Sequence, residues 1–474
     1  MGPSARSPPH SEVSSGKSLI IAPEVSLSTK FGFAERVGKR SGRAYAVHVL
    51  GCKVSQIEAD GIARTLESEG YEPASPGEPA EVVVLHACTV TARADRDALR
   101  QLRRLRRENP AALLAVTGCL AERDPEGLSR RPEVDVVAGH GSRLALPRLL
   151  EDAAAGLLPG KVADRTSSPA EVLASPFAAG GPDRTRAFLK IQDGCGRRCA
   201  FCIVPSLRGA ERSAPDGEVE DAIRSLGEAG VPEVVLCGVH LAAFGHDRGG
   251  SLLGLLRRLE ARPPACRLRL SSLEPMEAGE DLVDLVASSR VVAPHLHLPL
   301  QSGSDAVLRR MRRGMTRARY RALLLRAARA NPRVHLATDV IAGFPGETDA
   351  EFAETEALLA ELPLASLHVF PFSPRSGTAA AALAERDAVP AAIRTRRAAR
   401  LRALDATLRR RYAEAHDGRA ADVVALRGGV GLTETYVEVA LLPGGPPPAS
   451  RFAASLALRP DGRIEARPAV PFSC

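Results

Sequence analysis

The sequence predicts an α/β protein in which two parallel α/β units are followed by a small β-domain. From residue 44, apolar runs of strand length alternate with helical patterns, which is typical of a parallel sheet. The alternation stops in a loose segment rich in Pro, Ser and Gly, then resumes, and only strand-like runs follow the last long helical pattern. At 474 residues, the chain can hold about three domains. We expect a disordered extension (1–43), domains at 44–154, 183–410 and 411–474, and a linker (155–182).

The first α/β unit has three apolar strands, at 44–52, 81–88 and 112–119, with a helical pattern at 55–70. Each strand ends in a cysteine: Cys52, Cys88 and Cys119. Buried structural cysteines are one reading of this pattern. Parallel strands that each end in cysteine would, however, bring the three thiols to one edge of the sheet. Three ligands at that edge would leave a bound metal one open position.

In the second α/β unit, the sequence pattern predicts about six βα repeats. After a strand at 185–193, further strands are expected in five runs separated by helical patterns such as 219–230 and 317–330. The five runs are 233–239, 267–273, 295–300, 334–344 and 366–372. Repeats of this kind in one parallel array form a partial or complete barrel, with the active site at the carboxyl ends of its strands.

The stretch "KIQDGCGRRCAFCIVP" places Cys195, Cys199 and Cys202 within eight residues. Three thiolates on so short a loop can bind three irons of a [4Fe-4S] cluster. Zinc is the alternative metal, but a closed zinc site takes four protein ligands, commonly from paired C-x2-C arms. Only one such pair is present here, so the spacing favours a cluster whose fourth iron is open to a substrate.

Composition indicates the cellular compartment and the kind of partner that we expect. Nine cysteines in a chain with no secretory signal are better explained by metal binding or catalysis than by disulfides, and we expect a cytoplasmic protein with no membrane contact. The net charge of +8 fits a polyanionic partner such as RNA. Only six of the 64 basic residues are lysine; this arginine excess is also what a GC-rich genome would produce.

The spacing C-x3-C-x2-C, with Phe201 before the last cysteine, resembles the signature of the radical S-adenosylmethionine (SAM) enzymes. The resemblance implies that the open iron binds SAM, which is cleaved to a 5'-deoxyadenosyl radical. Other motifs stand where that superfamily contacts SAM: "CGVH", "SSLEP", "LPLQSGSD" and "DVIAGFPGET". The cofactor-binding residues that these motifs imply are Gly238, Glu274, Gln301, Ser302 and Gly343. We interpret Cys237 as a core residue.

The segments "LGCKVSQIEAD", "HACTVTARAD" and "TGCLAE" resemble the N-terminal domain of the methylthiotransferase family. The resemblance implies a second, auxiliary [4Fe-4S] cluster on Cys52, Cys88 and Cys119, so that both cysteine sets are catalytic. One SAM would then donate a methyl group to sulfur and another would supply the radical. "GCKVSQ" is most similar to the threonylcarbamoyladenosine (t6A37) type, although Ser55 replaces the usual Asn, and "HAC" replaces the usual "NTC".

The tail "GLTETYVEV" is similar to the TRAM domain, a small RNA-binding β-barrel, with Tyr436 its clearest aromatic candidate for base contact. The implied partners are the anticodon stem-loop of a tRNA, an electron donor such as flavodoxin or ferredoxin, and a sulfur source. The basic helical patterns at 100–109 and 394–402 are better explained as solvated faces than as RNA sites. Three alternatives stay open: isopentenyladenosine-37 tRNA as substrate, a ribosomal-protein Asp as substrate, and a non-catalytic Fe–S RNA-binding protein.

Overall fold

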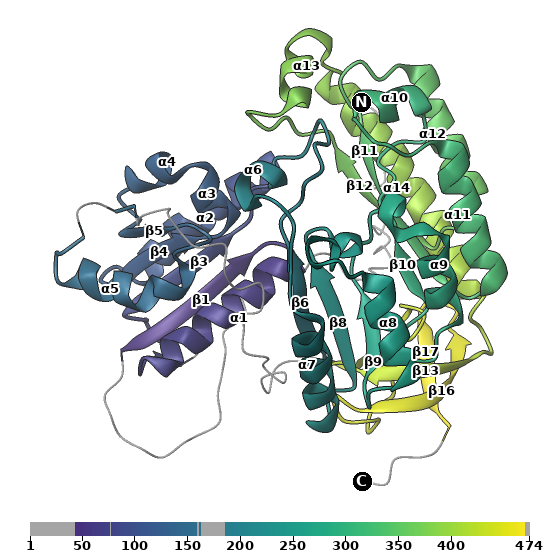
Figure 1. Cartoon of the computed structure of the whole chain (residues 1–474), viewed down its shortest axis with the longest axis horizontal. Coiled ribbons are helices and arrows are strands. Elements are labelled where there is room, and N and C mark those ends of the chain that lie inside the picture. Colours follow the sequence, from purple (N-terminus) through teal and green to yellow (C-terminus); the bar gives the residue numbers. More distant parts are fainter. Residues whose placement is uncertain (1–42, 76, 159–160, 163–184, 470–474) are drawn as a thin grey trace, which may run out of the picture.

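The computed structural model describes residues 43–75, 77–158, 161–162 and 185–469. The predicted extension (1–43) and linker (155–182) lie largely outside the described residues. Within these ranges the predicted architecture is confirmed, because a parallel sheet domain, a partial (βα) barrel and a closed β-barrel follow one another along the chain (Figure 1). None of the described helices combines the length and the apolar character that crossing a membrane requires.

The N-terminal sheet domain is a five-stranded parallel sheet in the order β2-β1-β3-β4-β5. Its central strand β3 is wholly buried because helices cover both faces of the sheet, which is why it reads as a continuous apolar run. Its elements are β1 (Ala44–Leu50), α1 (Lys53–Ser68), β2 (Glu72–Pro73), β3 (Val82–Ala87), α2 (Ala92–Glu108), β4 (Leu113–Thr117), α3 (Cys119–Arg123), α4 (Pro125–Ser129), β5 (Val136–Ala138), η1 (Arg143–Ala145) and α5 (Leu146–Ala154).

The central half-barrel contains six parallel strands in two sheets, β6-β8-β9 and β10-β11-β12, with short β7 antiparallel to β6. The bridge Leu268–Val292 joins the two sheets. Its elements are β6 (Ala187–Asp193), α6 (Val204–Arg208), β7 (Arg212–Ser213), α7 (Asp216–Glu228), β8 (Glu233–Gly238), η2 (Leu241–Ala243), η3 (His246–Arg248), α8 (Leu252–Ala261), β9 (Arg267–Leu270), α9 (Pro275–Ser288), β10 (His295–His297), α10 (Asp305–Arg310), α11 (Arg317–Ala330), β11 (His335–Ala342), α12 (Asp349–Glu361), β12 (Ser366–Pro371), α13 (Ala379–Asp387) and α14 (Ala391–Glu414).

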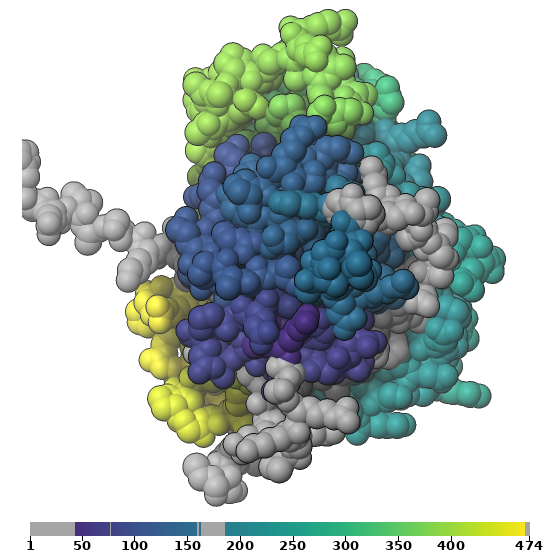
Figure 2. All heavy atoms as spheres, turned by 90° about the vertical axis from the view of Figure 1, so that its left-hand side faces the viewer, coloured from purple at the N-terminus to yellow at the C-terminus, as the bar shows by residue number. Residues whose placement is uncertain are grey.

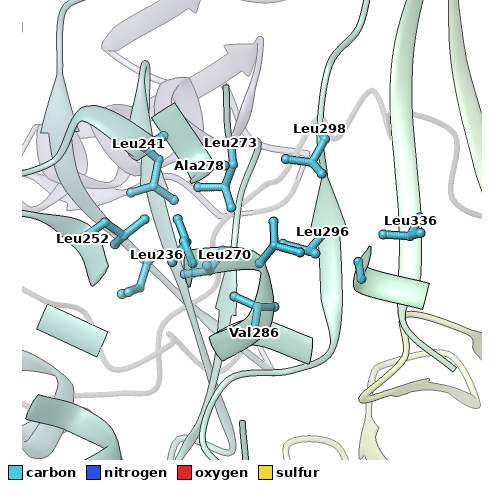
Figure 3. Packing of buried hydrophobic residues seen from close by; sticks show 14 of the residues in the cluster. Leu236, Leu241, Leu252, Leu270, Leu273, Ala278, Val286, Leu296, Leu298 and Leu336 are labelled. Carbon is cyan, nitrogen blue, oxygen red and sulfur yellow. The ribbon is translucent and has the colours of Figure 1, made fainter. Parts of the chain in front are cut away.

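The main core lies between the outer face of these strands and the helices. Leu236, Leu270 and Leu296 point from consecutive strands toward Leu252 and Val286 of the covering helices (Figure 3). Because successive strand residues face opposite ways, the alternate side chains of the same strands point into the half-barrel. That inner face is rich in polar groups, which include four histidines: His295, His297, His335 and His368.

The N-terminal sheet domain closes the open side of the half-barrel. Val54 and Ile57 of α1 pack on Val235 and Cys237, which lie on the inner face of β8. Figure 1 shows α1 alongside β6, and Figure 2 shows the N-terminal domain spread over this side of the molecule, between the green end of the half-barrel and the yellow C-terminal barrel. The carboxyl ends of the sheet strands therefore point toward the half-barrel interior.

The C-terminal barrel closes in the order β13-β14-β15-β17-β16. Arg269 of the half-barrel donates to the carbonyl oxygens of Thr433 (3.0 Å) and Glu434 (3.1 Å), and pairs with buried Glu233 (2.8 Å). This contact fixes the C-terminal barrel at the amino ends of the half-barrel strands. Its strands are β13 (Ala420–Ala425), β14 (Val430–Thr433), β15 (Glu438–Leu441), β16 (Arg451–Leu458) and β17 (Ile464–Pro468).

Candidate functional site

The three-cysteine loop begins directly after β6 and is fixed by backbone contacts. Gly194 turns the chain with φ 73°, and a Cβ there would lie 1.9 Å from the Ala210 carbonyl oxygen, so only glycine fits. The Cys195 amide then donates to Gly209 (3.0 Å), and the Cys202 amide donates to Cys199 (3.0 Å). The loop is thus folded back on itself, with its thiols on one side.

The three thiols lie close enough to influence one another. Burial, together with the neighbouring Cys199 and Cys195, raises the pKa of Cys202 to about 12. A thiol such as Cys202 gives up its proton when a metal binds, because the thiolate is the ligand form. We name this set the loop triad.

Charged side chains surround the loop triad. His240 lies 3.8 Å from the Cys195 sulfur and 2.9 Å from Glu211. Burial alone lowers the pKa of His240, but hydrogen bonds to Cys195, Glu277 and Glu211 raise it to about 10. His240 is therefore a cation beside the loop triad at neutral pH.

On the other side of the loop, Arg313 approaches the Cys199 sulfur at 3.7 Å and pairs with Glu274 at 2.6 Å. The other carboxylate oxygen of Glu274, Oε1, is buried and has no hydrogen-bond partner within the described residues. A buried acceptor left in this state is costly unless a ligand supplies a donor. Its position beside Cys199 suits a cationic group such as the amino group of SAM.

The second cysteine set lies at three neighbouring strand ends. Cys52 precedes α1, Cys88 follows β3, and Cys119 opens α3 directly after β4. The Cys88 amide donates to Leu50 of β1 at 2.7 Å, which ties the first two ends together. Burial, together with the adjacent Cys52 and Cys119, raises the pKa of Cys88 to about 12. We name this set the strand-end triad.

Gly118 makes the third member possible. Its φ is 89°, and a Cβ there would lie 2.8 Å from both the Ala87 carbonyl oxygen and the His86 ring. Glycine lets β4 approach β3 closely enough for Cys119 to join the other two thiols. Each triad therefore brings three soft sulfur donors together, with no fourth cysteine among the residues that the structure describes, and this donor set fits an iron–sulfur cluster with one open iron.

The predicted SAM-contacting residues lie at or just beyond strand ends of the half-barrel. Gly238 ends β8, Glu274 caps α9 after β9, and Gly343 follows β11. Gln301 follows β10 with φ 83° and pairs with Val340 through its backbone. A Cβ at Gly238 would meet the Gln192 side chain at 2.9 Å, so a packing contact already requires glycine there. Their contacts with SAM stay predictions.

Ser302 has a different setting from the one predicted. Its side chain is wholly buried, and its hydroxyl bonds the Thr355 hydroxyl (3.2 Å) and accepts from the Ser304 amide (3.2 Å). The hydroxyl thus fastens the turn after β10 to α12. This geometry favours a structural role over contact with a ribose.

Tyr436, the clearest aromatic candidate of the tail, has contacts within the protein. It packs on His295 with ring centroids 4.4 Å apart, and the Arg269 guanidinium lies 5.0 Å from its ring centroid. The ring packs inside the contact between the C-terminal barrel and the half-barrel, which agrees with the expectation that this aromatic-poor tail binds RNA mainly through backbone charge rather than base stacking. The sequence of the tail could not indicate this packing, because an aromatic residue in a β-domain can serve in an internal interface or in contact with a base.

Apart from Glu274, sequence reasoning assigned no role to the charged residues around the two triads. Arg313 and Arg208 are two of many arginines, and Glu58 lies in an ordinary helical pattern. One signal was available: Lys190 and Asp193 stand inside a strand that otherwise reads as apolar. Charged residues in a buried strand require partners. The two arginine-rich helices form ion pairs such as Arg400–Glu356 and Arg106–Asp135 (2.5 Å).

Comparison with known proteins places the chain. Residues 44–139 match the family described as "Uncharacterized protein family UPF0004", and residues 189–359 match the radical SAM superfamily. The structure of the radical S-adenosylmethionine methyltransferase TsrM from Kitasatospora setae, with tryptophan and a SAM analogue bound, is similar in fold. The TM-score is 0.51 at 17% identity, and the match covers 70% of this chain and 75% of that one.

Curated relatives match over most of their length. The threonylcarbamoyladenosine tRNA methylthiotransferase MtaB of Bacillus subtilis is 34% identical over 83% of this chain and 89% of its own, and that of Aquifex aeolicus is 33% identical over 83% and 95%. The tRNA-2-methylthio-N(6)-dimethylallyladenosine synthase of Parafrankia is 38% identical over 82% and 79%. The chain, with its C-x3-C-x2-C loop and its strand-end cysteines, therefore belongs to the radical SAM methylthiotransferase family.

Proposed function

We propose that this enzyme converts N6-threonylcarbamoyladenosine at position 37 of tRNA to its 2-methylthio derivative. The observation that carries the proposal is the pair of three-cysteine sets, one on the loop after β6 and one at the strand ends of the sheet domain. "GCKVSQ" at the first strand end favours the threonylcarbamoyl substrate. The adenine C2–H bond is neither acidic nor electrophilic, so its replacement calls for radical chemistry.

Two [4Fe-4S] clusters are proposed, one for each triad. The residues that would hold them are Cys195, Cys199 and Cys202 in 183–410, and Cys52, Cys88 and Cys119 in 44–154. With SAM, the loop-triad cluster would supply a carbon radical, and the auxiliary cluster would carry the sulfur that becomes the methylthio group. Each cysteine set acts here as a ligand set that leaves one iron open.

The chain's own side chains prepare the SAM site. Glu274 would accept a hydrogen bond from the amino group of SAM, with Arg313 holding its carboxylate in place. The backbone at Gly238, Gln301 and Gly343 would line the same strand ends. Ser302 we assign to the turn rather than to the cofactor. Because α1 and the sheet domain cover the open side of the half-barrel, they would exclude water from the radical.

The anticodon stem-loop is the proposed macromolecular substrate, since an unstacked loop base can enter a pocket. The C-terminal barrel (411–474) would contact its phosphates through exposed arginines rather than by stacking, because Tyr436 is used internally. Its exposed arginines include Arg419, Arg459, Arg463 and Arg467. An electron donor such as flavodoxin or ferredoxin and a sulfur source complete the set of partners.

A second candidate substrate is isopentenyladenosine-37 tRNA. The 38% identity to the dimethylallyladenosine synthase of Parafrankia favours it, against 34% to the B. subtilis t6A enzyme. Identity over the whole chain reflects mostly the fold and the chemistry that both groups of enzymes share. The residues of "GCKVSQ", by contrast, lie next to Cys52 in the proposed site. We therefore place the threonylcarbamoyl substrate first.

The test is mass spectrometry of tRNA nucleosides from a strain that lacks the gene. The expected result is loss of 2-methylthio-threonylcarbamoyladenosine and accumulation of its precursor, with restoration by the wild-type gene but not by a Cys199→Ala copy. Loss of the methylthio group from isopentenyladenosine or from a ribosomal Asp instead would contradict the substrate and keep the chemistry. No change in any methylthio product would contradict both.

A further inference from the structure

The inner face of the half-barrel carries a cluster of two histidines and one aspartate. Asp339 of β11 lies between His297 of β10 and His368 of β12, the two strands that flank β11 in the sheet. The Oδ1 atom of Asp339 is 2.8 Å from Nε2 of His297 and 3.1 Å from Nδ1 of His368. One ligand-type atom from each of the three side chains lies within 4.8 Å of the other two. We name this set the His–Asp–His cluster.

Other buried charges of the half-barrel have an evident role in docking. Lys190 (2.7 Å) and Arg208 (2.9 Å) donate to Glu58 of α1, and so join the half-barrel to the sheet domain. Among the described residues, the side-chain hydrogen bonds of the His–Asp–His cluster all stay within the half-barrel. Docking of another domain therefore does not explain the cluster.

The other two histidines of the inner face have a different setting. His295 and His335 pack on Tyr436, with ring centroids 4.4 and 5.4 Å away. Burial holds the pKa of both histidines well below the usual value, so both rings are neutral at neutral pH. These two rings serve the contact with the C-terminal barrel, whereas the His–Asp–His cluster combines imidazole nitrogens with a carboxylate.

The cluster has the donors and the spacing of a metal site. Two imidazole nitrogens and one carboxylate oxygen suit divalent transition metals such as Zn²⁺ and Fe²⁺. Ligand atoms that lie about 2.1 Å from one metal ion are about 3.0–3.4 Å apart, close to the two distances that Asp339 makes with the rings. The rings of His297 and His368 lie edge to face, with centroids 4.9 Å apart, so each can direct a nitrogen toward one ion.

The charge of the carboxylate also fits a cation. Burial acts to raise the pKa of Asp339, but the adjacent His297 and His368 outweigh this effect and lower it. Asp339 is therefore ionised at neutral pH. The side chain of His368 is 51% exposed, which gives an ion a path from solvent to the cluster.

Neighbouring groups already hold the ligands in place. The Oγ atom of Ser272 lies 2.6 Å from Nδ1 of His297. Because a hydroxyl can donate or accept, Ser272 can bond this nitrogen in either tautomer and leave Nε2 free for a metal. The carbonyl oxygen of Asp339 accepts from the Gln301 amide at 2.9 Å, which fixes the backbone beside the carboxylate. A supporting set of this kind is typical of metal sites.

We propose that His297, Asp339 and His368 bind a divalent transition-metal ion of the Zn²⁺ or Fe²⁺ type, in addition to the iron at the two cysteine triads. Three protein ligands leave further coordination positions, which take water or an oxygen atom of a substrate. The ion would lie close to Gln301, a residue predicted to contact SAM, because the Gln301 amide bonds Asp339. The inference goes beyond the proposed function and requires neither cluster.

The test is zinc binding by the full-length enzyme after anaerobic reconstitution of its iron–sulfur clusters. Zinc chloride is added, loose zinc is removed by gel filtration, and bound zinc is measured by elemental analysis and Zn K-edge X-ray absorption. The absorption data distinguish the cluster from cysteine-bound zinc, because Zn–N and Zn–O distances are about 2.0–2.2 Å and Zn–S distances about 2.3 Å. The variants are His368→Phe, Asp339→Asn and Ser272→Ala. His246→Ala is the matched control, since it removes an exposed imidazole of the half-barrel outside the cluster.

We expect the wild type and His246→Ala to bind zinc through nitrogen and oxygen alone. His368→Phe and Asp339→Asn should lose this zinc, and Ser272→Ala should bind it about 10–100-fold more weakly, because His297 loses its orienting partner. Thermal unfolding without zinc checks that the variants fold, and half-exposed His368 is the decisive position should Asp339→Asn not fold. Absence of sulfur-free zinc from the wild type overturns the proposal, as does its retention in His368→Phe or an equal loss in His246→Ala.

Discussion

The two cysteine triads reach the same donor set by opposite routes. The loop triad occupies eight consecutive residues, and a single turn at Gly194 is enough to bring its thiols together. The strand-end triad draws on residues 36 and 31 positions apart, so it exists only when β1, β3 and β4 are paired in register. The loop triad is a local property of the chain, whereas the strand-end triad is a property of the folded sheet.

Removal of a ligand should have the largest effect and should separate the triads most sharply. We expect Cys199→Ala to reduce SAM cleavage to background and to lower bound iron by about half, because the strand-end triad is untouched. Iron analysis and quantification of 5'-deoxyadenosine measure the two effects. Cys266→Ala is the control, since Cys266 is buried in the half-barrel core and belongs to neither triad. Loss of all iron in Cys199→Ala would mean that the triads do not load independently.

A core substitution in the sheet domain should break the strand-end triad without touching a ligand. Leu102 of α2 is wholly buried against the sheet, so Leu102→Ala should cost about 2–5 kcal/mol of unfolding free energy. We expect the auxiliary iron to be lost first on warming, while SAM cleavage persists. Thermal unfolding with iron analysis at each step measures this. Arg103→Ala, one exposed position along the same helix, should change stability by less than about 0.5 kcal/mol. If Leu102→Ala lost iron from the loop triad and from the strand-end triad at the same temperature, the contrast between the triads would be contradicted.

A substitution remote from both triads should leave both intact. Arg269→Met removes one of the three arginines that pair with buried Glu233, and two bonds to the C-terminal barrel, so we expect a loss of about 1.5–3 kcal/mol in docking of that barrel. Weaker binding of an anticodon stem-loop, with iron content and SAM cleavage unchanged, is the expected outcome. Gel-shift titration and limited proteolysis measure it, with Arg257→Met, an exposed position on α8 of the half-barrel, as control. Lower iron in Arg269→Met would show that the barrel supports a triad after all.

The smallest effect is expected at Ser302. Because its hydroxyl bonds Thr355 and Ser304 inside a turn, Ser302→Ala should cost about 1 kcal/mol of stability and leave the KM for SAM unchanged. Thermal unfolding and SAM-cleavage kinetics measure the two quantities. Thr433→Val is the control, because its buried hydroxyl likewise bonds a hydroxyl (Thr435) and accepts from a backbone amide (Val437), but in the C-terminal barrel. A several-fold rise in KM at Ser302 alone would restore the predicted ribose contact.

The same contrast explains how much the sequence could predict. The loop triad needed only spacing, and α11 was predicted with its observed bounds because a clear helical pattern lies between turn residues. The strand-end triad needed the further step that parallel strands share an edge. Arg208 and Glu58 were beyond reach, since their partners come from residues 150 positions apart. Nothing local to either residue distinguishes a charge buried in an interface from one in solvent.

The side chains around Glu58 have a consequence for the way the enzyme matures. Every bond that docks the sheet domain onto the half-barrel there is made by the protein itself, so docking does not wait for metal. Cys119 is buried in the docked state, whereas Cys52 stands exposed at the start of α1. Iron and sulfide delivered to the auxiliary site would therefore meet Cys52 first and reach Cys119 last. The auxiliary cluster would therefore assemble in a protein that is already folded and docked, and Cys52 would be its first ligand.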